Sequence, residues 1–200
     1  MIRLYQFALS GNCHKVRLLL SLLALPYETI DVAGAKQEHK SPAFLQMSPF
    51  GQVPVLTDGD VVVRDSQAIL VYLARRYGGA SWLPDDAGGL AEVTAWLSTA
   101  ANEVARGPNS LRLHYKFGRA IDLVAAEAVS TQLFHVLERR LASAPWLAGD
   151  HVTIADVAVH PYIALAPEAK LDFSSYPAVR AWLARMSELP GYVGMPGMVT

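Results

Sequence analysis

Two neighbouring polar residues, Asp65 and Ser66, stand directly before the apolar stretch QAILVYLA, whose spacing predicts a helix. The first turn of a helix has free backbone N–H groups and carries the positive end of the helix dipole, so it attracts anionic groups. The same dipeptide also fits a plain helix cap, with Ser66 as the capping residue beside a solvated acid. The pattern alone therefore predicts either an anion site or a cap.

A proline interrupts the stretch SPFGQVPVL, which otherwise resembles a buried β-strand. Pro54 cannot donate a hydrogen bond to a neighbouring strand, and an X-Pro bond adopts the cis form at modest cost. One interpretation is that Pro54 ends the pairing at a sheet edge. The other is that the turn exposes the N–H and C=O of Val53, which then pair with an extended peptide like an added strand.

Three polar side chains, Ser10, Asn12 and Cys13, gather at the start of the apolar helical run KVRLLLSLLAL. A hydroxyl or an amide there can donate to an anion, and a helix start can lower the pKa of a thiol. Inside a helix, however, a buried and inert cysteine is the ordinary case. Cys13 is the only cysteine, which excludes an internal disulfide, a Cys-x-x-Cys redox pair and a cysteine-rich zinc site. We expect no metal site.

The elements that position these residues follow a β-α-β-α-β-β-α order over the first part of the chain, with a hairpin signal at Asp58-Gly59. The second part shows only helical patterns, at about 90–105, 121–142, 153–164 and 176–189. Thr153 and Asp156 form a capping-box pattern before the third of these helices. We therefore expect an α/β domain over residues 1–77, a turn-rich linker over 78–88 and an all-α domain over 89–200.

The composition describes a compact chain without a strongly charged face. Hydrophobic residues make up 52% and charged residues 18%, and the formal net charge is −1. This balance argues against disorder and against nucleic acid or an anionic membrane as a partner. The N-terminus does not resemble a signal peptide, and the most apolar run is too short to cross a bilayer. We expect a cytoplasmic protein with a small-molecule ligand.

Three segments together resemble the cytosolic glutathione transferases: SGNCHKVRLLL, EHKSPAFLQMSPFGQVPVL and DSQAILVYLA. The second segment is most similar to the phi and theta classes. The resemblance covers nearly the whole chain and implies a thioredoxin-like N-terminal domain followed by a helical domain, a cis Val53–Pro54 bond and a role in detoxification. Asp65 stands where the family usually has Glu, and Ser48 stands where it has Asn.

The resemblance also implies a site for glutathione as co-substrate. The Val53 backbone would pair with the cysteinyl unit, and the start of the third helix would bind the γ-glutamyl group. The remaining contacts would go to the glycyl carboxylate and the cysteinyl backbone. The residues implied are His39, Lys40, Gln52, Val53, Pro54, Asp65 and Ser66.

Ser10 matches the family's catalytic serine, whose hydroxyl donates to the glutathione sulfur and favours thiolate over thiol. Asn12 is the alternative donor, as in some bacterial relatives, and Cys13 is a third candidate through a mixed disulfide. Tyr5 lies inside the first strand and is expected in the core. We expect the second substrate, a small hydrophobic electrophile, between the domains, near Leu9, Arg106, His114 and Tyr115.

Three functions are consistent with these residues. The first is a glutathione transferase, in which the thiolate attacks an electrophilic carbon. The second is a glutathione-dependent disulfide or peroxide reductase that uses Asn12 or Cys13. The third is a non-catalytic binding protein of the same fold, which would have no need of the glutathione residues. The resemblance further implies a homodimer.

Overall fold

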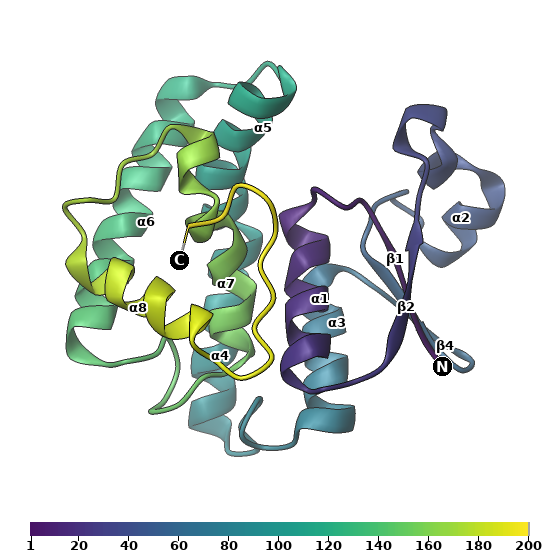
Figure 1. The fold of residues 1–200 in the computed structure, drawn as a ribbon, viewed down its shortest axis with the longest axis horizontal. Coiled ribbons are helices and arrows are strands. Elements are labelled where there is room, and N and C mark those ends of the chain that lie inside the picture. Colours follow the sequence, from purple (N-terminus) through teal and green to yellow (C-terminus); the bar gives the residue numbers. More distant parts are fainter. Residues whose placement is uncertain (200) are drawn as a thin grey trace.

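The computed structural model describes residues 1–199 of the chain. Thr200, the last residue of the predicted helical domain, lies outside the described residues. Four strands form one mixed sheet in the order β2–β1–β3–β4 (Figure 1). The strands are β1 (Ile2–Gln6), β2 (Tyr27–Asp31), β3 (Val55–Asp58) and β4 (Val61–Arg64).

The strand directions follow from the connections. β1 is parallel to β2 and antiparallel to β3, and β3 and β4 form an antiparallel hairpin. A parallel pair needs a crossover, and α1 (Gly11–Leu22) provides it. The predicted hairpin signal at Asp58-Gly59 lies between β3 and β4. The sheet and its hairpin are therefore confirmed.

The remaining α-helices of the described residues divide between the two halves of the chain. They are α2 (Pro42–Met47) and α3 (Ser66–Leu73) beside the sheet, and α4 (Ala87–Ala101), α5 (Ser110–Phe117), α6 (Leu123–Ser143), α7 (Ile154–Ala164) and α8 (Pro177–Ser187) in the second half. No helix within residues 1–199 combines the length and the apolar character that a membrane span needs.

The helix α5 was not predicted from the sequence, and α4 ends earlier than predicted. Residues Ala105–Asn109 form a single wide helical turn between the two helices, and it contains Pro108. Proline inside a helix removes a hydrogen bond and clashes with the preceding turn. The prediction was wrong at this point because Gly107-Pro108 ended the recognisable pattern, although the chain resumes a helix at Ser110.

Alternation along β1 divides the core into two layers. Ile2 and Leu4 point to the large core, which also contains apolar residues of α1, α3, α4, α6, α7 and α8. Tyr5 points to the other face, where it packs with Phe44 of α2 and with Val55. Figure 1 shows α1 and α3 between the sheet and the helical half, with α2 on the far side. The large core is therefore shared by the two halves of the chain, whereas the smaller one belongs to the sheet and α2.

The predicted capping box at the start of α7 is confirmed and extends further than the sequence shows. Asp156 is fully buried. Its carboxylate accepts hydrogen bonds from the Thr153 backbone amide at 3.1 Å, the Leu147 backbone amide at 3.0 Å and the Trp182 ring N–H at 2.9 Å. Burial raises the pKa of Asp156 to about 6. This residue therefore joins α7 to α8 and to the segment before α7.

Candidate functional site

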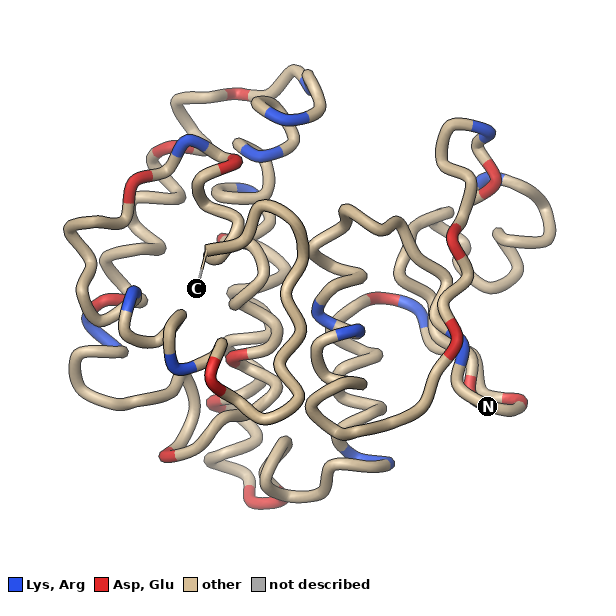
Figure 2. The backbone as a smooth tube through the Cα atoms, viewed as in Figure 1, with Lys and Arg blue, Asp and Glu red and all other residues tan. Residues whose placement is uncertain are grey.

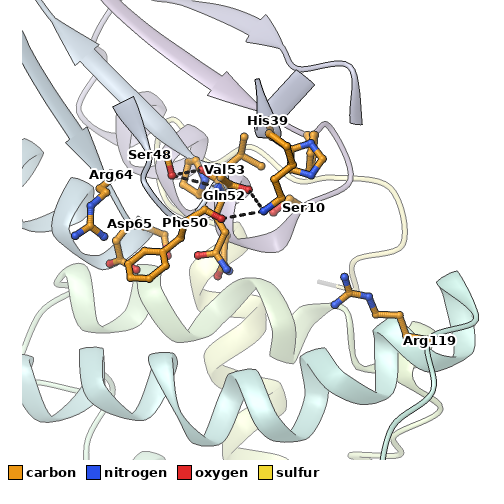
Figure 3. Close-up of a pocket in the computed structure, with 15 residues that line it drawn as sticks. Ser10, His39, Ser48, Phe50, Gln52, Val53, Arg64, Asp65 and Arg119 are labelled. Carbon is orange, nitrogen blue, oxygen red and sulfur yellow. Dashed lines mark hydrogen bonds between the residues drawn. The ribbon is translucent and has the colours of Figure 1, made fainter. Parts of the chain in front are cut away.

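A pocket of about 510 Å³ opens where the start of α1, the loop before β3 and the junction between β4 and α3 meet (Figure 3). Apart from Cys13, the residues predicted to bind or activate glutathione line it: Ser10, Asn12, His39, Lys40, Gln52, Val53, Pro54, Asp65 and Ser66. The lining residues that were not predicted for the site are Phe7, Ser48, Phe50, Gly51, Arg64 and Arg119. The fold thus gathers the predicted residues around one cavity, and their individual roles stay predictions.

Ser10 is the N-cap of α1. Its hydroxyl oxygen accepts a hydrogen bond from the Cys13 backbone amide at 3.3 Å. Arg17, further along α1, donates to the Ala8 carbonyl at 3.0 Å and ties the loop before Ser10 to the helix. Capping uses the serine oxygen as an acceptor, so its own proton stays available to a ligand in the pocket.

The two alternatives to Ser10, Asn12 and Cys13, differ in whether they line the pocket. Asn12 lines the pocket from the first turn of α1. Cys13 is fully buried and is not among the lining residues. Burial raises the pKa of the Cys13 thiol above its ordinary value, so the reactive thiolate is disfavoured. The geometry favours the inert, buried cysteine over a catalytic one.

The loop before β3 has a fixed backbone at its pocket face. The Val53–Pro54 peptide bond is cis. Just before it, the Ser48 hydroxyl donates to the Gln52 carbonyl at 2.9 Å and accepts from the Gln52 amide at 3.1 Å. Ser48 is buried, so these bonds are shielded from water. The serine that replaces the family's asparagine therefore holds Gln52 and the approach to Val53.

Lys40 and Gly51 fix the other side of this loop. The Lys40 ammonium donates to the Phe50 and Gly51 carbonyls, at 2.9 and 3.0 Å. Gly51 has a φ of +57°, and a Cβ there would lie 2.6 Å from the His39 carbonyl oxygen. The His39 ring packs edge-on against Phe7 at 5.5 Å between ring centroids. The loop thus brings two basic side chains to the pocket wall.

Asp65 is the N-cap of α3, and Ser66 is its first residue, so the interpretation of Ser66 as the cap was wrong. One carboxylate oxygen of Asp65 accepts from the Gln67 amide at 2.9 Å and from the Ala68 amide at 3.1 Å. The acidic side chain reaches the free amides that a serine would have capped. Asp65 has a φ of +72°, a region that non-glycine residues rarely adopt and that is common at ligand sites.

Two arginines of the lining escaped prediction. Arg64 ends β4 and lies over the exposed Phe50 ring, 5.3 Å from its centroid. Arg119 follows the left-handed Gly118 that ends α5, and Figure 3 shows it on the opposite side of the pocket from Arg64. Figure 2 shows charges of both signs spread over both halves of the molecule. The one sequence signal for Arg119 is Gly118, which ends α5, and this helix was not recognised in the sequence.

The residues predicted for the second substrate do not line this pocket. Arg106 lines a separate cavity of about 260 Å³ between α5 and α6. The Tyr115 ring lies 4.9 Å from the His114 ring centroid, in an edge-to-face arrangement, and 4.3 Å from the Lys170 ammonium. Leu9 is exposed on the loop before α1. The structure does not bring these four residues together, and their role in substrate binding stays a prediction.

Comparison with known proteins identifies the family. Residues 4–81 match the model of the glutathione S-transferase N-terminal domain, and residues 111–190 match that of the C-terminal domain. The chain therefore belongs to the glutathione S-transferase family, as the three segments predicted. The predicted fold class, a thioredoxin-like domain followed by a helical domain, is confirmed with it. Glutathione is the co-substrate of this family.

Individual relatives share about a third of the sequence. The chain is 32% identical to the disulfide-bond oxidoreductase YfcG of Escherichia coli K12, over 95% of this chain and 92% of that protein. A glutathione S-transferase from Xanthobacter autotrophicus Py2 superposes with a TM-score of 0.91 at 30% identity, over 98% of each chain. A glutathione transferase homologue from Drosophila mojavensis with bound glutathione has a TM-score of 0.85 at 30% identity, over 94% of this chain and 88% of that one.

Proposed function

We propose that this protein is a glutathione transferase that binds glutathione in the 510 Å³ pocket and transfers it to a small electrophile. The observation that carries the proposal is the convergence of the predicted serine, Val53 before the cis proline and the start of α3 on one cavity. In the proposed reaction the glutathione sulfur attacks an electrophilic carbon. The sulfur–carbon bond forms as the leaving group departs with its electron pair, and the thiol proton goes to solvent.

The two ends of glutathione would contact different residues of the pocket. Ser66 and the first amides of α3 offer donors to the γ-glutamyl carboxylate. The second carboxylate oxygen of Asp65 is not used by the cap, so it can accept from the α-amino group. Lys40 would supply positive charge and His39 a ring N–H for the glycyl carboxylate, while Gln52 and Val53 would contact the cysteinyl unit.

Ser10 would stabilise the thiolate without a general base. A free cysteine-type thiol has a pKa of about 8.5, and lowering it by about two units needs about 2.7 kcal/mol. A hydrogen bond to a charged group contributes roughly 1.5–3 kcal/mol. The N-terminus of α1 adds roughly 0.3–1 kcal/mol. The two contributions together match the requirement.

Replacement of Ser10 tests this proposal. Ser10→Ala should lower kcat with chlorodinitrobenzene by about 30-fold or more, which is the loss expected from a hydrogen bond of 2–3 kcal/mol. Ser10→Thr keeps the hydroxyl and is the matched control, with most of the activity retained. Calorimetry should show nearly unchanged glutathione affinity in both variants. Full kcat in Ser10→Ala would refute the assignment.

A glutathione-dependent disulfide reductase is the second candidate, because Asn12 also lines the pocket and the relative YfcG is a disulfide-bond oxidoreductase. Reduction of a mixed glutathione disulfide that exceeds aryl-halide conjugation, and that is lost in Asn12→Ala, would favour it. Cys13→Ser should have no effect on either activity, since the thiol is buried. A wild-type protein that does not bind immobilised glutathione would instead support the non-catalytic alternative.

A second copy of this chain is the proposed protein partner. Phe50 lines the pocket and is 67% exposed, and Val62 lies on the edge strand β4 and is 50% exposed. The proposal rests on the family resemblance, and these two exposed apolar side chains are the candidates for the contact. Sedimentation at micromolar concentration would show a dimer if this holds. The domain boundaries at 77/78 and 88/89 are likewise a proposal, which limited proteolysis would test.

A further inference from the structure

Among residues 1–199, the helical half of the chain contributes a single residue, Arg119, to the lining of the 510 Å³ pocket. The other lining residues lie between Phe7 and Ser66, whereas Arg119 lies in the segment that joins α5 to α6. Figure 3 shows it below Ser10 and across the pocket from Arg64. The helical half therefore presents a guanidinium to this pocket, a group that binds carboxylates through paired N–H donors.

The backbone of Arg119 is held on both sides of its Cα. Its N–H donates to the Leu113 carbonyl at 3.1 Å. Its own carbonyl oxygen lies 2.8 Å from Nδ1 of His114, and this nitrogen carries the proton because a carbonyl oxygen only accepts. Gly118, the residue before it, has a φ of +69°, the left-handed conformation in which many helices end. The end of α5 thus holds the arginine at a fixed place on the pocket wall.

The guanidinium of Arg119 is not engaged by the protein. Within residues 1–199 it has no hydrogen-bond acceptor, no carboxylate within ion-pair distance and no aromatic ring beneath it. The Lys40 ammonium, in contrast, donates to two backbone carbonyls, and Arg64 lies over the Phe50 ring. Arg119 is exposed, so water solvates its N–H groups. A ligand carboxylate can replace this water with two parallel hydrogen bonds.

Glutathione, in the position proposed above, does not need Arg119. Its γ-glutamyl group would lie at Asp65 and the start of α3, and its glycyl carboxylate at His39 and Lys40, all in the sheet half. The electrophile must approach the sulfur from the side that glutathione does not fill. Arg119 is the lining residue from the helical half, and its positive charge favours an electrophile of negative charge.

We propose that Arg119 selects a second substrate that carries an anionic group, in the first place a carboxylate, and binds this group while the sulfur attacks the electrophilic carbon. The proposal rests on the function proposed above and names the substrate class of the same site. The carboxylate takes no part in the bond changes: the sulfur–carbon bond forms, the leaving group departs with its electron pair, and the carboxylate stays on the conjugate. Arg119 determines specificity, whereas activation of the thiol is assigned to Ser10.

The test compares two glutathione conjugates that differ in one charge, the conjugate of chloronitrobenzoate and that of the neutral chloronitrobenzamide. Calorimetry gives the Kd of both without any turnover. The wild-type protein should bind the carboxylate conjugate about threefold to fivefold more tightly than the amide, as expected for an ion pair that water can reach. Arg119→Gln should reduce this preference to less than about twofold.

Two further variants and the salt concentration separate the effect of charge from general damage. Arg119→Lys keeps the charge but not the planar group, so it should retain part of the preference. Arg139→Gln removes another exposed arginine, on α6 and outside the pocket lining, and should retain all of it. Salt raised from about 0.01 M to about 1 M shortens the Debye length from about 30 Å to about 3 Å, so the wild-type preference should shrink.

Two results would overturn the inference. The first is an equal preference for the carboxylate conjugate in the wild type and in folded Arg119→Gln. The second is a loss of affinity for glutathione itself in Arg119→Gln by the same factor as for the carboxylate conjugate, because Arg119 would then bind glutathione and not the electrophile.

The two proposals fail in different ways. If the wild-type protein binds neither glutathione nor the conjugates, the proposed function fails and the selection by Arg119 fails with it. If it binds the conjugates with the expected preference but does not turn over aryl halides, the transferase function fails and the anion site at Arg119 stands. Ser10→Ala should lose kcat and keep the wild-type preference, because Ser10 acts on the sulfur and Arg119 on the anionic group.

Discussion

Replacing Lys15 with methionine removes a fully buried cationic group. The Lys15 side chain is fully buried between α1 and α7, and its ammonium lacks a hydrogen-bond partner within residues 1–199. Burial lowers its pKa from 10.5 to about 7, and only Asp65 acts in the opposite direction. The ammonium lies 5.6 Å from the centroid of the Tyr162 ring of α7. Methionine fills a similar volume with a flexible apolar chain, so the packing against Tyr162 is largely kept.

The magnitude follows from the change in pKa. At about 1.4 kcal/mol for each pH unit, this change corresponds to at most about 5 kcal/mol of destabilisation by the charged form. The folded pKa lies below the unfolded one, so between these values the unfolded chain holds a proton that the folded chain lacks. The wild-type free energy of unfolding should therefore rise with pH across this window, and the destabilisation is complete below it.

Urea unfolding of both proteins at about pH 6.5, 8 and 9.5 measures the effect. Lys15→Met should be more stable by about 3–4 kcal/mol at the lowest pH, after about 1 kcal/mol is subtracted for the lost cation–π contact. The difference between the proteins should fall to about 1.4 kcal/mol at the highest pH, which is still about one unit below the unfolded pKa of lysine. The contributions of the other titratable groups are the same in both proteins and cancel in this difference. A difference that is the same at every pH would refute the reasoning.

Two further substitutions test the buried hydrogen bonds of Asp156 and the role of Arg119 in the pocket wall. Asp156→Ala leaves three buried donors without an acceptor and should lower the free energy of unfolding by about 3 kcal/mol or more, whereas Asp156→Asn keeps one acceptor and should lose less. An unchanged urea midpoint in Asp156→Ala would contradict this. Arg119→Ala removes a cation on the helical side of the pocket, so it should raise KM several-fold for chloronitrobenzoate, which is anionic, and little for neutral chlorodinitrobenzene. Equal effects on both substrates would exclude an electrostatic role for Arg119.

The features that the sequence predicted correctly depend on local rules. The hairpin at Asp58-Gly59 needs only two residues with the right turn preference, and the Thr153–Asp156 box needs only a spacing of three. The residues predicted for glutathione, which line one pocket but whose roles stay predictions, come from three short segments that are recognisable because each lies at one end of a strand or helix. Local signals of this kind do not depend on how distant parts of the chain pack.

The features that escaped prediction depend on tertiary packing. Arg119 lines the pocket because the unpredicted helix α5 ends at Gly118 and turns the chain back toward it. Ser66 looked like a cap, but Asp65 adopts a positive φ and takes that role. No pattern in one chain segment reports a neighbour that lies a hundred residues away.

During synthesis on the ribosome, β1, α1 and α3 emerge well before α7. The apolar residues of α1 and α3 that pack on α7 in the finished protein then face solvent, because their partner is not yet made. The nascent sheet with its helices is thus an incomplete folding unit that needs chain more than eighty residues downstream. Since α1 carries Ser10 and packs on α7, the helix that positions this serine gains its packing partner only near the end of translation.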